Sequence, residues 1–564
     1  MLQIISGKFF NSQELSKSEG NNLLYSNYSW ILEFDTCITK VIPILERKGD
    51  PAYVIRYINQ IEKDPVLVRT GDEEIVQQFE SLCIFGLQAM FDSEKSTIER
   101  ICGHPKGGLQ SIRPSSYVPR YFNSYIHGDR QEIIQFSKFV KKVIGLPRKK
   151  YNSVISCTIA FSNSLKLLDH NFDLAYSMLI YCLESLSQKN DYYKPIWDDY
   201  QKASKLDKIL INVDLDVGKK IRNIILEDQH LKLQKRFVNF IMKNISDSFF
   251  VEESRNIKWP IRRSEIEHAL VNAYSMRSSY AHELEPVLQH LKYPSIAEGD
   301  TYHYDNSPYF TYSGLIRLTH HVIQNYIFEQ EYVEREEYNW HSELPNILIV
   351  KMAPNCWIWN TNGWNISDAK KRFSGFLSEY SNAIISQDPI TDCTVLMELY
   401  ESQIPRITGD SQITILIHYF LYNFCLPKER RAKLFDALKD DPKNINLLRS
   451  CKIETLIFLL ITGQEWCYDL SDCIKTYQKY QKNKFQSNSI VLPQIFELLI
   501  LVKIANECFE QGHYEEYYQW ITLAYLESAG QSDIQDLFNR KFSYGELIDI
   551  NSVCALIFSP KKPV

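Results

Sequence analysis

Residues 273–282 have the sequence Ala273-Tyr274-Ser275-Met276-Arg277-Ser278-Ser279-Tyr280-Ala281-His282. The apolar residues Ile266, Leu270 and Ala273 recur at helical spacing, and Arg277 lies eleven residues after Ile266, which is about three turns of a helix. The arginine is therefore predicted to lie on the apolar stripe of a helix. A guanidinium in that position needs a partner, because an unpaired buried charge is costly.

That partner can be a core carboxylate such as Glu184 or Glu267, a second subunit, or a phosphate. In the last case Arg277 can hold the phosphate while His282 moves a proton near neutral pH. Such a pair suits RNA cleavage without a metal, in which the 2′-hydroxyl attacks the adjacent phosphate. Five residues rotate by about 140° on an ideal helix, so Arg277 and His282 do not face one spot, and we expect a homodimer to complete the site.

The spacing of an arginine and a histidine is weak evidence alone, because it recurs in this chain. Helix context favours Arg277, since Ser264 and Glu267 have the spacing of a capping box just before its apolar stripe. The rival pairs are Arg120 with His127, Arg262 or Arg263 with His268, and Arg335 with His341.

Between residues 151 and 330 nearly every stretch has helical periodicity, which predicts a helical bundle. Its early part is Asn171-Phe172-Asp173-Leu174-Ala175-Tyr176-Ser177-Met178-Leu179-Ile180-Tyr181-Cys182-Leu183-Glu184-Ser185-Leu186, an apolar run that ends in Leu-Glu-x-Leu. This run and residues 273–282 resemble two helices of the HEPN domains, the later of which bears an Arg-x(4–6)-His motif. HEPN domains are helical bundles of bacterial toxins, abortive-infection proteins and CRISPR-associated ribonucleases.

The resemblance covers roughly a third of the chain and implies a metal-independent endoribonuclease that needs no cofactor and usually assembles its site across a dimer. Arg277, His282 and the polar Ser278 would be the catalytic residues. Ser278 departs from the family, which often has Asn, Asp or His after the arginine. A bacterial anti-phage defence or toxin role follows from the family alone. The alternative is a non-catalytic helical scaffold that dimerises through the bundle.

The flanking regions are expected to be different in kind. Residues 1–147 mix short apolar runs and turns, which predicts a small α/β unit with Leu2–Ile5 as its first strand. The capping-box pattern Thr70-Gly71-Asp72-Glu73 predicts a helix to about Phe91, and Asp129 is expected to cap another.

The second half of the chain is expected to be helical. Residues 331–366 are predicted to be a linker or hairpin, and residues 367–564 an all-helical domain in which a repeat-like arrangement is one alternative. This domain is a candidate surface for a protein trigger or regulator. The fold class is therefore mainly α.

The formal net charge of -6 gives no global attraction for nucleic acid, so any RNA-binding surface must be local. Candidates are the basic residues that flank the bundle, although such clusters are usually solvated faces. They are Arg148, Lys149, Lys150, Arg262 and Arg263. The thirteen cysteines are scattered, no metal-binding motif occurs, and no apolar stretch is long enough for a bilayer, so we expect a reduced cytoplasmic protein with no metal and no membrane partner.

Overall fold

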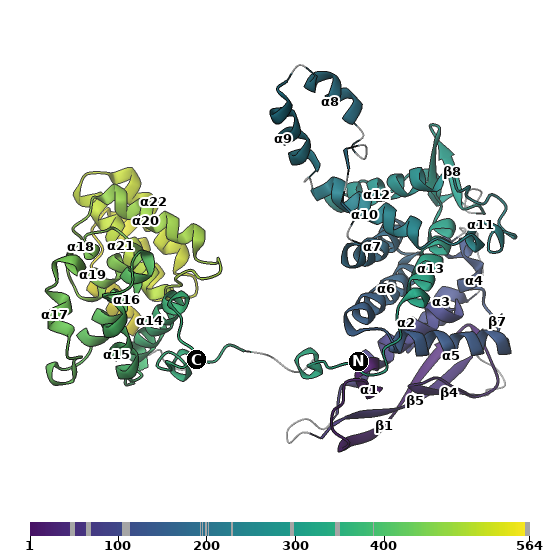
Figure 1. Cartoon of the computed structure of the whole chain (residues 1–564), viewed down its shortest axis with the longest axis horizontal. Helices are drawn as coiled ribbons and strands as arrows, with labels where there is room; N and C mark the ends of the chain where they lie inside the picture. Colours follow the sequence, from purple (N-terminus) through teal and green to yellow (C-terminus); the bar gives the residue numbers. More distant parts are fainter. Residues whose placement is uncertain are drawn as a thin grey trace. The chain divides into compact units, whose positions relative to one another are not determined.

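The computed structural model divides the chain into two compact units with separate hydrophobic cores, Met1–Ile349 (unit 1) and Val350–Val564 (unit 2). The fold is mainly α, as predicted (Figure 1). The structure describes residues 1–44, 51–63, 69–103, 113–191, 193–194, 196–197, 200, 202–211, 213–226, 229–293, 298–344, 350–386 and 388–558, and only the backbone at 229–232, 542–544 and 557–558.

An antiparallel sheet of five strands, in the order β3-β4-β5-β1-β6, forms one end of unit 1 (Figure 1). In β5 the buried residues Tyr53, Ile55 and Tyr57 alternate with more exposed ones, which is the period of a strand with one covered face. A short parallel pair, β2 with β7, lies outside this sheet. The strands are β1 (Leu15–Ser26), β2 (Tyr28–Ser29), β3 (Phe34–Asp35), β4 (Thr39–Ile44), β5 (Ala52–Glu62), β6 (Phe91–Asp92) and β7 (Ile126–His127).

The first residues form a helix and not the expected strand. Leu2–Ile5 is the short helix α1, and all four of its side chains are buried. A run of four residues is too short for its apolar periodicity to distinguish a strand from a helix. The burial of all four side chains in the core of unit 1 is compatible with the helix that forms.

The helix α2 (Asp72–Leu87) exists, but the predicted capping box does not form. The hydroxyl of Thr70 donates instead to Oδ1 of Asn59 at 3.0 Å, and Gly71 takes the N-cap position. The helix ends before Phe91 because Gln88 adopts a left-handed conformation with φ of 50°.

One hydrophobic core joins the sheet to the helices of unit 1. The ring of Phe85 in α2 lies 5.5 Å from that of Phe139 in α5 (Arg130–Ile144) and 5.2 Å from that of Phe161 in α6 (Arg148–Leu167). On its other side α2 faces the sheet. The expected boundary between residues 147 and 151 therefore lies inside a single core.

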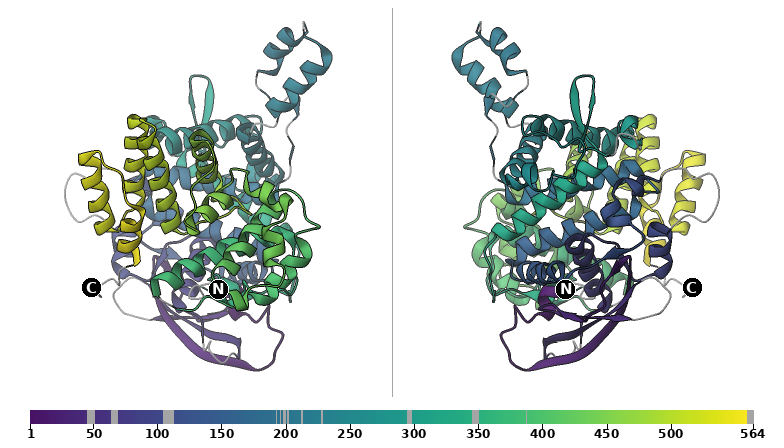
Figure 2. Two further views of the ribbon diagram at one scale, coloured as in Figure 1. Left: turned by 90° about the vertical axis from the view of Figure 1, so that its left-hand side faces the viewer. Right: turned by 90° about the vertical axis from the view of Figure 1, so that its right-hand side faces the viewer.

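The bundle of unit 1 is built on long helices that stack away from the sheet (Figure 1). Asp129 caps α5 as predicted, since its carboxylate accepts hydrogen bonds from the backbone N–H of Gln131 and Glu132. The helices α8 and α9 project from the rest of the unit (Figures 1 and 2). Besides α5 and α6 the helices are α3 (Lys95–Cys102), α4 (Pro119–Phe122), α7 (Phe172–Asn190), α8 (Ala203–Leu210), α9 (Leu215–Leu226), α10 (Gln229–Lys243), α11 (Ser248–Val251), α12 (Ile266–Glu283) and α13 (Tyr312–Glu329).

A hairpin that the sequence reading missed interrupts the bundle. Strands β8 (Thr301–Tyr304) and β9 (Ser307–Phe310) pair antiparallel through a two-residue turn. Asp305 and Asn306 in this turn have φ of 47° and 57°, which is the left-handed geometry of a type I′ turn and suits these two residue types.

The described residues of unit 2 form helices joined by turns and loops, with no strand among them. Its central helices are α16 and α21, which are buried on nearly all sides, as expected for helices inside a larger helical core. The helices are α14 (Ala369–Ser386), α15 (Thr394–Gln403), α16 (Asp410–Phe424), α17 (Phe435–Lys439), α18 (Pro442–Leu448), α19 (Ile453–Ile461), α20 (Leu470–Asn483), α21 (Gln494–Glu510), α22 (Tyr514–Glu527), α23 (Ser532–Tyr544) and α24 (Ile550–Phe558).

The expected linker at 331–366 divides between the two units. Trp340 is only 2% exposed and its ring lies 5.6 Å from that of Phe10, so residues before 345 pack on unit 1. Residues 350–364 form turns and no strand, and the carbonyl of Ile358 accepts a hydrogen bond of 2.7 Å from Arg372 of α14. Residues 350–364 thus form no strand, which leaves the linker alternative for them, while residues 345–349 lie outside the described part of the chain.

No helix in the described part of the chain is both long and apolar enough to cross a membrane.

Candidate active site

The helix that carries the motif begins later than its sequence suggests. Ser264 precedes α12, Glu265 is the N-cap residue, and no side chain caps the first turn, so the predicted capping box is wrong. The apolar stripe is confirmed: Ile266, Leu270 and Ala273 are fully buried, and Arg277 is 8% exposed.

Arg277 is held by side chains of its own helix and of α7. A terminal nitrogen of Arg277 forms an ion pair with Glu184. The guanidinium carbon lies 4.6 Å from the ring centre of Tyr181 and 4.9 Å from that of Tyr274, which places the cation over two aromatic faces. The hydroxyl of Tyr274 donates to Oε1 of Glu184 at 3.0 Å. The partner of Arg277 within one chain is therefore a core carboxylate, one of the possibilities that the sequence left open.

The hydrogen-bonding capacity of Arg277 is only partly used. Its Nε–H meets no acceptor among the described residues, although it is buried. Burial lowers the pKa of Arg277 from its ordinary value, and the nearby hydroxyl of Tyr181 acts in the opposite direction. Since an arginine stays charged in proteins, its five N–H donors leave room for a second acceptor.

Ser278 and His282 lie on other faces of α12. Ser278 is half-buried, and His282 is exposed in the last turn of the helix. A rotation of about 140° over five residues directs His282 away from the bundle interior that Arg277 enters. The structure does not bring Arg277 and His282 together within one chain.

The end of this helix carries an unusual residue. Leu284 caps α12 in the left-handed region with φ of 56°, and it is 77% exposed. A leucine in that conformation is strained, because its Cβ approaches the backbone, and glycine is the usual residue there. The strain and the exposed apolar side chain lie two positions from His282.

The rival arginine–histidine pairs have a different environment. Arg120, Arg262, Arg263 and Arg335 are all exposed, so none of them enters the core as Arg277 does. Burial therefore distinguishes the motif at 277–282 from the other occurrences of the same spacing.

The candidate RNA-binding residues fall into two groups. Arg148 is 4% exposed, with Nε at 3.0 Å from Glu343 and another nitrogen at 3.3 Å from Gln3, so its donors serve the fold of unit 1. Lys149 is exposed and Lys150 is half-buried.

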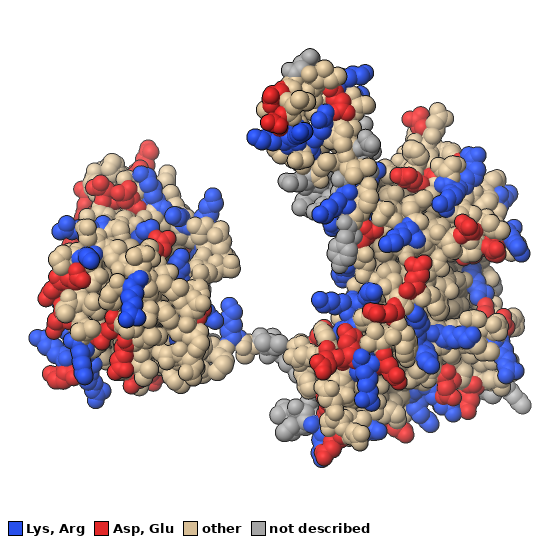
Figure 3. Space-filling view, in the orientation of Figure 1, with Lys and Arg blue, Asp and Glu red and all other residues tan. Residues whose placement is uncertain are grey.

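The second basic cluster is exposed but partly engaged. Arg262 forms an ion pair with Glu265, and the Arg263 guanidinium lies 5.9 Å from the ring centre of Phe250. On the face shown in Figure 3, lysine and arginine are interspersed with acidic residues over unit 1 and form no continuous positive surface.

Sequence reasoning missed a buried polar network on α13. Nδ1 of His321 lies 2.7 Å from Glu253, and its Nε2 accepts from the backbone N–H of Ser246 at 3.1 Å, so the ring proton belongs on Nδ1. One turn earlier, Nε of Arg317 donates to the buried Asp300 at 3.0 Å. Arginine and histidine four residues apart on one helix were the available sequence signal.

The neighbouring histidine belongs to another environment. The ring of His320 stacks on Phe85 at 4.6 Å, and burial lowers its pKa to about 4. The described residues hold no group of three or more His, Cys, Asp or Glu side chains placed to bind a metal ion.

Comparison with known proteins finds no family model, no curated protein and no solved structure that matches this chain. The HEPN assignment thus stays a prediction from the two segments that carry the resemblance.

Proposed function

We propose that unit 1 is a metal-independent endoribonuclease of HEPN type, in which Arg277 binds the scissile phosphate and His282 transfers protons. The observation that carries the proposal is the burial of one arginine of the motif, beside the Leu-Glu-x-Leu segment of α7, with its histidine exposed at the end of the same helix. Ser278 is assigned as a further polar group near the phosphate.

The chemistry needs no group beyond these side chains and the RNA. The 2′-oxygen forms a bond to phosphorus while the bond to the 5′-oxygen breaks, so one group must accept the 2′ proton and another must protonate the leaving oxygen. A two-fold dimer supplies two copies of His282 for these roles and two copies of Arg277 for the developing negative charge. Arg277 would donate hydrogen bonds to the phosphate, either beside its ion pair with Glu184 or in place of that pair.

Assembly is the first test, because a single chain does not bring Arg277 and His282 together. The sheet and the bundle share a core, so light scattering should use the full chain and residues 1–349, not the bundle alone. A dimer at micromolar concentration is expected for both, and strictly monomeric protein in both would exclude the composite site.

Cleavage is the decisive test. Purified protein should cut total RNA in the presence of EDTA and leave cyclic phosphate ends, because the nucleophile is the hydroxyl of the RNA. Arg277→Ala and His282→Ala should each lower the rate by ~10²-fold or more. His268→Ala and His341→Ala, at the rival spacings, are the matched controls and should cut normally. A requirement for a divalent metal, or normal cleavage by both site variants, would refute the assignment.

The second candidate is a non-catalytic scaffold that dimerises through the bundle. The ion pair between Arg277 and Glu184 favours this scaffold. A hydrogen bond from Tyr274 fixes Glu184, so the pair gives the arginine a structural role. Dimerisation without cleavage of any RNA supports this reading. The defence or toxin role, the cytoplasmic location, and the binding of a trigger by unit 2 stay predictions from the sequence and the family.

A further inference from the structure

Unit 2 contains a cavity of about 420 Å³ that no sequence motif indicates. Its wall comes from the starts of three helices, α14, α16 and α19, from one side of α20, and from the loop that follows α20. The volume lies within the range of pockets that hold small molecules.

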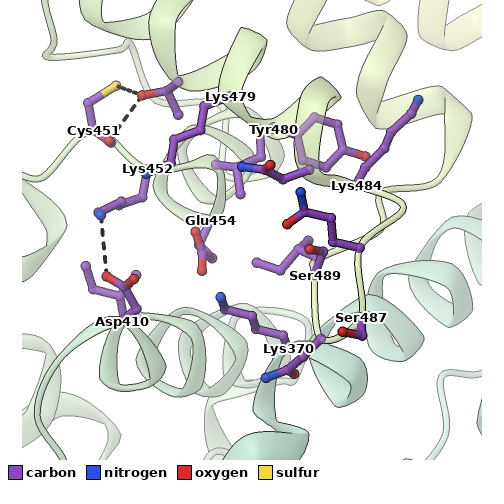
Figure 4. Close-up of a pocket in the computed structure, with 17 residues that line it drawn as sticks. Lys370, Asp410, Cys451, Lys452, Glu454, Lys479, Tyr480, Lys484, Ser487 and Ser489 are labelled. Atoms are coloured by element: carbon purple, nitrogen blue, oxygen red, sulfur yellow. Dashed lines mark hydrogen bonds and ion pairs between the residues drawn. The ribbon is translucent and has the colours of Figure 1, made fainter. Parts of the chain in front are cut away.

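A buried carboxyl group forms part of this wall. Glu454 is 6% exposed, and its Oε1 accepts a hydrogen bond of 2.8 Å from the hydroxyl of Thr414. Figure 4 shows Glu454 near the middle of the cavity, between Lys452 and Asp410 on one side and the loop serines on the other. No lysine or arginine of the described residues forms an ion pair with Glu454. A buried carboxyl without a cation is costly unless a proton or a ligand compensates it.

The cavity also has an excess of positive groups. Four lysines line it against two carboxyls, Asp410 and Glu454. Lys452 pairs with Asp410 at 3.4 Å and Lys484 with Glu497 at 3.0 Å, whereas Lys370 and Lys479 form no ion pair with any described residue. The N-terminal ends of α14, α16 and α19 add the positive ends of three helix dipoles. An anion is therefore favoured here on two independent grounds.

The remaining wall is rich in neutral hydrogen-bonding groups. The loop after α20 presents amide and hydroxyl side chains that bond to no other described residue, so they are available to a ligand with several hydroxyl groups. Tyr480 is the one aromatic residue among the described lining residues, and its hydroxyl is already bonded to Glu497, so the wall offers no platform for stacking a base. The loop and helix-end side chains concerned are Asn483, Gln486, Ser487, Asn488 and Ser489.

We propose that this cavity is a binding site for a small phosphorylated sugar or polyol. The lysines and helix ends bind the phosphate, while Glu454 and the loop side chains bind hydroxyl groups. The site lies wholly within unit 2 and does not depend on the chemistry proposed for unit 1.

Calorimetric titration of the full-length protein with four kinds of probe tests the proposal. Glucose 6-phosphate, ribose 5-phosphate and glycerol 3-phosphate are the phosphorylated probes. Glucose tests the hydroxyl groups alone, inorganic phosphate tests the phosphate alone, and adenosine monophosphate tests a nucleotide. At least one phosphorylated probe should bind ~10-fold or more tightly than inorganic phosphate and than glucose. No binding of any of them up to about 10 mM, or equal binding of inorganic phosphate, overturns the proposal. Tighter binding of adenosine monophosphate overturns the sugar assignment.

Variants locate the site. Lys370→Gln should lower the affinity for the phosphorylated probe by ~10-fold or more. Glu454→Gln should lower that affinity without changing the affinity for inorganic phosphate. Lys475→Gln is the matched control, because Lys475 is exposed on α20 but does not line the cavity. Equal losses in Lys370→Gln and Lys475→Gln would show a general effect of charge and exclude this site.

Cys451 provides a readout that does not depend on a variant. It lines the cavity, and a hydrogen bond with Cys473 lowers its pKa from the ordinary value to about 7, which favours the reactive thiolate form. A bound sugar phosphate should slow its alkylation by iodoacetamide several-fold, as measured by mass spectrometry of the Cys451 peptide. The exposed Cys467 should react unchanged. Equal protection of both cysteines, or of neither, contradicts binding in the cavity.

Discussion

Both units bury an ionisable side chain at a candidate site, but they neutralise it differently. In unit 1 Arg277 has a carboxylate in direct contact, two aromatic faces and a tyrosine that fixes the carboxylate. In unit 2 Glu454 has one hydroxyl donor and an open cavity, with lysines nearby but no ion pair. A ligand of unit 1 meets an arginine that already has an internal partner, whereas the hydroxyl groups of a ligand of unit 2 can donate hydrogen bonds to a carboxyl group that has no ion pair. The comparison predicts that the two sites respond differently to the loss of a single charge.

The largest effect is expected from breaking the internal pair of unit 1. Glu184→Ala should lower the free energy of unfolding by about 3–5 kcal/mol at neutral pH, because it leaves the Arg277 guanidinium buried without its carboxylate. Urea denaturation measures the loss. The double variant Glu184→Leu with Arg277→Met should recover most of it, since two apolar residues can replace a buried pair. A loss below about 1 kcal/mol would show that Arg277 does not depend on Glu184.

A smaller free-energy effect, confined to catalysis, is expected at the other end of the motif. His282→Ala should reduce RNA cleavage by ~10²-fold, which corresponds to about 2.7 kcal/mol of barrier, because it removes a proton donor or acceptor. The free energy of unfolding should change by less than ~0.5 kcal/mol, since the side chain is exposed. Equal losses of stability and activity would mean that His282 acts through the fold.

In unit 2 the expected effect depends on pH. Burial raises the pKa of Glu454 above its ordinary value, while the hydrogen bond from Thr414 and the charges of Lys370 and Lys452 oppose the shift. The folded state thus binds the proton more strongly than the unfolded state. Stability from this group is fully present below the unfolded pKa and is lost as the pH rises through the folded pKa, by about 1.4 kcal/mol for each unit between the two values.

Glu454→Gln isolates that contribution, because all other groups cancel in the difference. The free energy of unfolding of the wild type, minus that of the variant, should fall between pH 4 and pH 8. Denaturation of both proteins across this range measures it. A difference that is flat, or that rises with pH, would contradict the raised pKa. A phosphorylated sugar that binds in the cavity should change the slope of this difference in the wild type.

The smallest effect is expected at the strained cap of α12. Leu284→Gly should raise the free energy of unfolding by about 0.5–1 kcal/mol, because glycine adopts the left-handed conformation without strain. Leu526→Gly is the control, since Leu526 is also exposed but lies in helical backbone, where glycine should cost up to about 1 kcal/mol. A loss of stability in Leu284→Gly that grows with protein concentration would instead place Leu284 in a subunit contact.

Helical periodicity predicted the bundle and the buried position of Arg277, because a stripe of apolar residues fixes which side of a helix enters the core. Capping was less predictable. Asp129 caps α5 as expected, whereas Thr70 bonds to Asn59 on a neighbouring strand and Ser264 lies outside α12. A hydroxyl has several backbone and side-chain partners to choose from, and tertiary contacts decide among them.

The two candidate sites also differ in how far the sequence predicted them. The sequence named Glu184 as one possible partner of Arg277, since both lie on apolar stripes, but only the packing of α7 on α12 selects it over Glu267. The cavity of unit 2 was not predicted at all. Its charged groups come from segments near residues 370, 410, 452 and 480, and no local spacing connects them.

The position of α2 between the sheet and α6 has a consequence for synthesis of the chain. A ribosome that has completed α2 must add the 60 residues from 88 to 147 before α6 begins. At a synthesis rate of about 5–20 residues per second, the face of α2 that meets α6 stays uncovered for several seconds. The nascent sheet and α2 then expose Phe85 and its apolar neighbours, which makes this interval a point for chaperone capture or for aggregation.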